Sequence, residues 1–147
     1  SDVGSSLTFR RDLFRGKKAA HNAFCGYAND QLHKMTAYTL NGRMGAKRKA
    51  LVDKFGFDLK NGAHLIRLLR CGVEYLRTGY LQIDRTGIDA DELKAIKRGE
   101  WPLAKVRATA EALFEEAHKA FENSPLPDDP DYDQINKLVV ELMKEVY

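Results

Sequence analysis

The sequence predicts an all-α protein, a bundle of about six helices, and three observations support this. Apolar residues recur at every third or fourth position in several long stretches, which is the spacing of one helical face. Glycine and proline are few, 11 and 4 among 147 residues, and several stand where those stretches end. Alternation of apolar and polar residues is confined to 80–85, so at most one short extended segment or hairpin is expected there.

The first predicted elements follow a tail. Residues 1–15 include the small polar run SDVGSS and read as a tail or broken linker, which leaves 16–147 as one helical domain. Apolar and small residues spaced at three and four predict a helix from about Lys17 to about Thr39, ended by the Asn41-Gly42 turn signal. A second helix is expected from Ala46 to Phe55, before Gly56.

The strongest predicted helix is central in the chain. Asp58 is placed to cap it, its clearest part spans 63–78, and Gly79 stands where a helix C-cap favours glycine. Asp89 is expected to cap a short helix, 90–97, that ends before Gly99.

Two further helices complete the predicted bundle. Pro102 suits the first turn of a helix that runs to about Asn123. Its expected buried stripe is Leu103, Val106, Ala110, Leu113, Phe114, Ala117 and Phe121. The acidic connector SPLPDDPDYD then leads to a terminal helix, whose apolar residues begin at Ile135 and end at Val146.

Length and composition set the class of protein. A chain of 147 residues can bury a core without metal or disulfide support. It has no run of about 18 apolar residues and no signal-peptide layout, so we expect a cytoplasmic protein with no membrane partner. Cys25 and Cys71 lie in predicted helices without CxxC spacing, and we expect small buried or half-buried thiols.

Charge is distributed unevenly along the chain. Residues 1–77 carry 15 Lys and Arg against 6 Asp and Glu, a net charge of +9, whereas 78–147 carry a net charge of −6. The first half is therefore a candidate surface for a polyanion, although a solvated face would look the same in sequence.

One polar stripe on the strongest helix supplies the candidate binding residues. Apolar and small residues fill one arc of 60–77, and a histidine and arginines fill the opposite arc. Guanidinium and imidazole groups suit phosphates and nucleobases, so the stripe is either a ligand-binding face or a plain solvated surface. In both cases Arg67→Ala is expected to leave folding nearly intact. The candidate residues are Lys60, His64, Arg67, Arg70 and Glu74.

No catalytic or metal-ligating residue is predicted from the motifs. Asp89 with Asp91, and the acidic run 129–133, have the spacing of metal-binding carboxylates, but both precede helices, where capping explains aspartate. No dinucleotide, P-loop, zinc-protease or nucleophile-elbow motif occurs. Arg15 and His21 share a spacing with some small helical ribonucleases, a match of only two residues.

Several ordered blocks resemble a known family. They are Gly26-Tyr27-Ala28 with Gln31-Leu32, Phe57-Asp58 with Lys60 and His64 to Leu69, Gly72 with Glu74, Leu76 and Gly79, Ile96 to Trp101, and Ser124 to Pro127. Together they resemble the predicted nucleotidyltransferase family of DNA polymerase beta type associated with RNA repair. The resemblance covers only the C-terminal helical half of such enzymes, from about residue 16 onward.

The resemblance implies a helical substrate-binding domain that closes over a nucleoside triphosphate and an acceptor RNA or DNA. It also implies that an upstream catalytic α/β domain, ending near residues 1–15, binds Mg²⁺ and the triphosphate. Gly4-Ser5 has no following carboxylate pair, so this chain alone is expected to bind no Mg²⁺ and to be inactive. Two alternatives stay open: a non-enzymatic helical nucleic-acid-binding module, and an interaction domain whose oppositely charged halves pair in a dimer.

Overall fold

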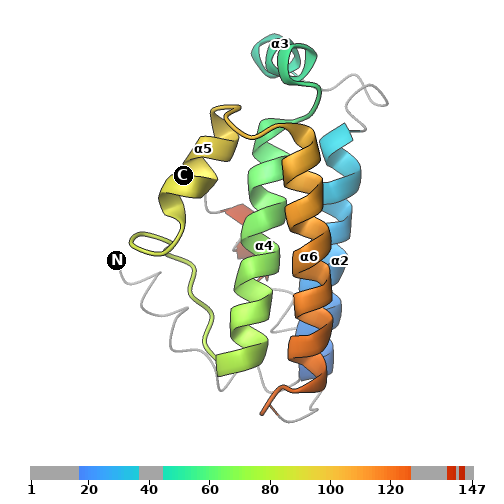
Figure 1. Cartoon of the computed structure of the whole chain (residues 1–147), viewed down its shortest axis with the longest axis vertical. Helices are drawn as coiled ribbons and strands as arrows, with labels where there is room; N and C mark the ends of the chain where they lie inside the picture. The colour runs from blue at the N-terminus through green and yellow to red at the C-terminus, as the bar shows by residue number, and fades with distance from the viewer. Residues whose placement is uncertain (1–16, 37–44, 127–138, 142, 145–147) are drawn as a thin grey trace.

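A computed structural model describes residues 17–36, 45–126, 139–141 and 143–144. Its helices are α2 (Lys17–Thr36), α3 (Ala46–Phe55), α4 (Leu59–Thr78), α5 (Ala90–Lys97) and α6 (Leu103–Glu122). The described part of the chain contains no strand, so the predicted all-α bundle is confirmed. Helices α2, α4 and α6 run side by side, α3 crosses one end of them, and α5 lies against α4 (Figure 1).

Helix α4 is the centre of the bundle. Fourteen of its twenty residues are buried, because α2, α6 and α5 all pack against it. Helices α2 and α4 approach closely at Gly72, where an added Cβ would lie 2.8 Å from Phe24. A glycine is therefore required at this crossing.

The ends of α4 follow the predicted capping signals. The carboxylate of Asp58 accepts hydrogen bonds from the backbone N–H groups of Lys60, at 3.1 Å, and Asn61, at 3.3 Å. Gly79 ends the helix with φ of 80°, in the left-handed region that favours glycine. Both caps are confirmed.

The other helix ends agree with the prediction to within a few residues. Helices α3 and α5 have the predicted bounds, and α6 ends beside Asn123. Helix α2 ends at Thr36, and the predicted stretch from 37 to 39 lies outside the described residues. So do the tail 1–15 and most of the predicted terminal helix, of which 139–141 and 143–144 are helical.

The structure of residues 80–89 differs from the sequence-based expectations at two points, the segment 80–85 and the cap at Asp89. Residues 80–85 have irregular backbone rather than a strand or hairpin. Asp89 precedes α5 but its side chain makes no capping hydrogen bond. Its carboxylate is instead bound by Arg70 and Arg85, and strong ion pairs in a partly buried site outcompete a cap.

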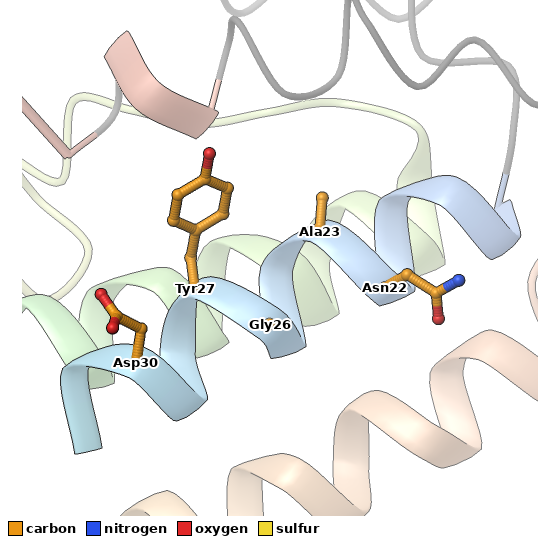
Figure 2. Close-up of a pocket in the computed structure, with 5 residues that line it drawn as sticks. All are labelled: Asn22, Ala23, Gly26, Tyr27 and Asp30. Carbon is orange, nitrogen blue, oxygen red and sulfur yellow. The ribbon is translucent and has the colours of Figure 1, made fainter. Parts of the chain in front are cut away.

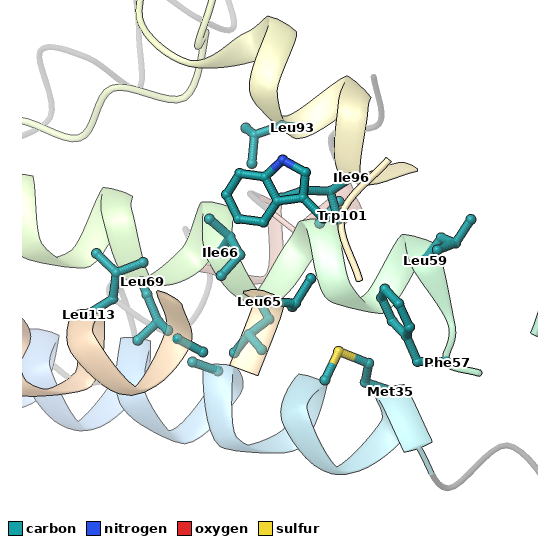
Figure 3. Packing of buried hydrophobic residues seen from close by; sticks show 14 residues of the cluster. Met35, Phe57, Leu59, Leu65, Ile66, Leu69, Leu93, Ile96, Trp101 and Leu113 are labelled. Carbon is teal, nitrogen blue, oxygen red and sulfur yellow. The ribbon is translucent and has the colours of Figure 1, made fainter. Parts of the chain in front are cut away.

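The core is built from α4 and its three main neighbours. Val106, Ala110, Leu113 and Ala117 of α6 are buried as predicted, whereas Leu103, Phe114 and Phe121 are half-buried. Figure 3 shows the indole of Trp101 beside Ile66, Leu93 and Ile96, which join α4 to α5. This packing holds α5 over a face of α4 that the sequence assigned to solvent.

Candidate functional site

The predicted polar stripe of α4 is largely covered. The expected solvent exposure is wrong for His64, which is 7% exposed, and for Arg67, which is 2% exposed. Helix α5 packs against α4, and the segment 79–89 contacts Arg67 and Glu74 of this arc, so α4 buries polar as well as apolar residues. Two groups of charged residues result, one at each end of the stripe.

Arg67 attaches the irregular segment to α4. Its guanidinium donates a hydrogen bond of 3.1 Å to the backbone carbonyl of Ile83. One turn further along, the buried thiol of Cys71 lies 3.5 Å from the carbonyl of Gln82. Because 80–85 has no ladder of its own, such side-chain contacts satisfy its backbone. The expectation that Arg67 could be removed at no cost to the fold therefore conflicts with its contacts.

The C-terminal part of the stripe forms an ion-pair network, made of Arg70, Glu74, Arg85, Asp89 and Glu92. Arg85 binds both carboxylate oxygens of Glu74 at 2.8 Å and reaches Asp89 at 2.8 and 3.1 Å. Arg70 binds Asp89 at 2.9 Å and Glu92 at 2.6 Å. This network joins α4 to the segment 79–89 and to α5, so its charges are directed at each other.

Burial and pairing act against each other at Asp89. Burial alone would raise the pKa of this carboxyl, but hydrogen bonds from Arg85 and Arg70 hold the pKa below its ordinary value. Arg85, whose side chain is only 1% exposed, was not among the residues predicted from the sequence. Its one sequence signal is an aspartate four residues later, a spacing that also occurs by chance.

Cations from three helices gather at the N-terminal end of the stripe. Lys60 and His64 belong to α4, Arg48 to α3 and Lys97 to α5, and we call these four residues the basic cluster. Burial lowers the pKa of His64 to about 4, helped by the charges of Arg67, Lys60, Lys97 and Arg48. Burial and the charge of Lys60 lower the pKa of Lys97. Positive charge is thus concentrated around a neutral, buried imidazole.

Asp58 fixes one member of the basic cluster. Its carboxylate pairs with the guanidinium of Arg48, and the same guanidinium lies 3.4 Å from Oδ1 of Asn61. The capping residue of α4 therefore also holds α3 at the start of α4. Lys60, the second residue of the helix, is exposed to solvent.

Other candidates do not join this cluster. Within the described part of the chain, no group of three His, Cys, Asp or Glu side chains could hold a metal ion. The run 129–133 and Arg15 lie outside the described residues, and Asp91 is exposed. His21 packs against Phe121, with ring centroids 4.7 Å apart, on α2 and α6.

The cysteines are placed as predicted. Cys25 is half-buried and Cys71 is buried, and both are free thiols. Burial raises the pKa of Cys71 to about 11, which keeps it protonated and unreactive at neutral pH.

A separate shallow cavity of about 280 Å³ follows α2 and is lined by Asn22, Ala23, Gly26, Tyr27 and Asp30 (Figure 2). Asp30, the one charged side chain of these five, forms an ion pair with Lys34 at 2.9 Å. A cavity whose charged lining group is a carboxylate does not suit a phosphate.

Comparison with protein-family models, with curated proteins and with solved structures finds no match to this chain. The resemblance to a nucleotidyltransferase family therefore rests on the sequence blocks alone. Among the described residues, no helix is long and apolar enough to cross a membrane.

Proposed function

We propose that this chain is the helical substrate-binding domain of a nucleotidyltransferase, and that its basic cluster binds the phosphates of a nucleoside triphosphate or of nucleic acid. The observation that supports this proposal is that the charges of Lys60, Lys97 and Arg48, from three helices, all act on the buried imidazole of His64, while Arg48 is also paired with Asp58. Cations placed close together repel one another, and an anion bound between them relieves that repulsion.

The proposal changes the roles of the predicted residues. Lys60 and His64 stay as binding residues, with Arg48 and Lys97 added to them. Arg70 and Glu74 are bound within the ion-pair network, and Arg67 binds a backbone carbonyl. Arg70 supports the site by holding α5, and with it Lys97, against α4, while Glu74 and Arg67 hold the preceding segment 79–89 against α4.

The chemistry assigned to the domain is charge neutralisation and positioning. Phosphoryl transfer needs metal-bound triphosphate and an oriented hydroxyl, and cationic side chains stabilise the charge that develops on the phosphates. By the resemblance, an upstream catalytic α/β domain would supply the Mg²⁺ ligands, in a cytoplasmic enzyme. The isolated chain is then expected to transfer no nucleotide.

The test is a binding titration with fluorescent ATP, repeated at increasing salt. We expect Lys60→Glu/Lys97→Glu to weaken binding at least tenfold, because each substitution replaces an attraction with a repulsion. The matched control is Arg107→Glu/Lys119→Glu, which makes the same change of charge at exposed positions of α6. If both double variants weakened ATP binding equally, the effect would come from net charge alone, and this would contradict the proposed site.

A further inference from the structure

Helix α3 is attached to the bundle by few contacts. Val52 is its one fully buried residue, and α3 crosses the end of the bundle instead of running along it (Figure 1). Lys47, Lys49 and Lys54 are all exposed, against a single acidic residue, Asp53. Most of the surface of α3 is thus available to a partner, and that surface is positive.

The charges of α3 do not serve the helix itself. Lys47, Arg48 and Lys49 occupy its first turn, where the helix dipole favours acidic residues. Gly45 at the N-cap offers no side-chain cap. A sequence selected only for helix stability would place these residues in the last turn, so their position points to a negatively charged partner.

The positive surface of α3 is continuous with the basic cluster. Arg48 is held by Asp58 and Asn61 at the start of α4, and these two residues flank Lys60 in the sequence. At the other end of α3, Phe55 packs against Gly99, where an added Cβ would lie 2.4 Å from the phenyl ring. Gly99 has φ of 81° and follows Lys97 by two residues. Both ends of α3 are therefore anchored beside members of the cluster.

From these contacts we infer that α3 is a docking arm for the phosphate backbone of a polynucleotide strand whose end reaches the basic cluster. This inference rests on the proposed function and extends it from a single phosphate group to a chain of them. A ten-residue helix is about 15 Å long, which spans several phosphates of a strand at about 3.4 Å per nucleotide along a helix axis.

The composition of α3 disfavours other anionic partners. A helix that lies on a membrane buries a broad apolar face. On α3 the one large exposed apolar residue is Leu51, at 40%, while Val52 and Phe55 face the protein. Protein interfaces are centred on aromatic or arginine anchors, whereas three of the four cations of α3 are exposed lysines and the fourth, Arg48, is paired with Asp58. Lysines spaced along a surface suit a repeated, flexible array of phosphates.

The test compares a labelled 20-nucleotide single strand with fluorescent ATP. We expect Lys47→Glu/Lys49→Glu to weaken strand binding at least tenfold and to reduce the slope of log K against log salt by about 1.4, the value for two phosphate contacts on a single strand. The affinity for ATP should stay within twofold of wild type, since neither lysine belongs to the basic cluster. Circular dichroism checks that the bundle is intact, and Arg107→Glu/Lys119→Glu controls for net charge.

The outcomes separate this inference from the proposed function. Wild-type strand affinity in the α3 variant, or a loss no larger than in the α6 control, overturns the docking arm even if the cluster variant loses ATP. If the α3 variant loses the strand while Lys60→Glu/Lys97→Glu binds ATP normally, the arm stands and the proposed site is wrong. Binding to phosphatidylserine vesicles without binding to the strand would assign α3 to a membrane and overturn the inference.

Discussion

The two ends of the polar stripe on α4 are alike in sequence and opposite in structure. At the C-terminal end, arginines and carboxylates alternate in space, and each charge has a partner within 3.1 Å. At the N-terminal end, the charges of Lys60, Arg48 and Lys97 act on the neutral imidazole of His64, Arg48 is paired with Asp58, and the pKa values of His64 and Lys97 are lowered. The same residue types therefore hold the fold at one end and form the proposed binding site at the other.

The difference arises from what packs over each end. The segment 79–89 brings Arg85 and Asp89 to the C-terminal end, and α5 adds Glu92. Over the N-terminal end, α3 and the last turn of α5 bring mainly basic residues. The role of a charged residue on α4 thus depends on which element packs over it. Each substitution or pH change proposed next acts on one end of the stripe.

The largest expected effect follows from removing Arg85. We expect Arg85→Met to cost about 3 to 5 kcal/mol in the free energy of unfolding, because it leaves the nearly buried Asp89 without one of its two cations. Urea denaturation measures the loss. The control is Arg98→Met, which breaks the exposed pair with Glu100 and should cost no more than about 1 kcal/mol. Equal small losses would mean that the network does not hold the fold.

Acidification tests the N-terminal end. The pKa of His64 is about 4 in the folded protein and about 6.5 in the unfolded chain, so the unfolded chain takes up the proton first. The free energy of unfolding should be unaffected by His64 above pH 6.5 and should fall as the pH is lowered toward 4, by roughly 3 kcal/mol at most. His64→Gln should flatten this part of the stability curve, whereas His33→Gln, at an exposed position of α2, should leave it unchanged. Unfolding measured from pH 4 to 8 shows the outcome, and an unchanged slope in His64→Gln would exclude His64 as the cause.

Removing Arg67 tests the boundary between the two ends. We expect Arg67→Ala to cost about 1.5 to 3 kcal/mol, since the carbonyl of Ile83 loses its hydrogen bond from a buried charged donor. Leu69→Ala is a reference for a cavity in the core, at roughly 2 to 5 kcal/mol. Hydrogen exchange separates them: Arg67→Ala should speed exchange mainly in 79–89, and Leu69→Ala throughout α4. If hydrogen exchange became faster uniformly along the chain in both variants, Arg67 would have no specific role in attaching 79–89 to α4.

Capping residues made the helix ends predictable from the sequence. The site was not predictable, because it depends on how separate elements pack over α4. Asp58 and Gly79 act on residues one turn away, so their effect can be read locally. The helical wheel of α4, in contrast, assigned one arc to solvent because it could not show that an irregular segment covers it. Tertiary packing of 79–89, a stretch whose alternation at 80–85 predicted only a short extended segment, decided the burial of Arg67.

The members of the site that the sequence missed lie far from α4 in the chain. Arg48 and Lys97 precede and follow His64 by 16 and 33 residues, and their own helices give no sign that they meet. Only Lys60 and His64 share a face of one helix, which is why both were found. A wheel drawn for one helix cannot identify a cluster built from three.

The smallest effect is expected at Lys60, and it is the sharpest test of the comparison. Lys60 is exposed, and its charge lowers the pKa values of both His64 and Lys97. Lys60→Gln should therefore change the free energy of unfolding by no more than about 0.5 kcal/mol, toward greater stability, because it removes repulsion and breaks no ion pair within the described part of the chain. The pKa of His64, followed by NMR, should rise in the same variant. A loss of stability above about 1 kcal/mol would instead mean that Lys60 holds the fold as Arg70 does, and the two ends of the stripe would no longer differ in kind.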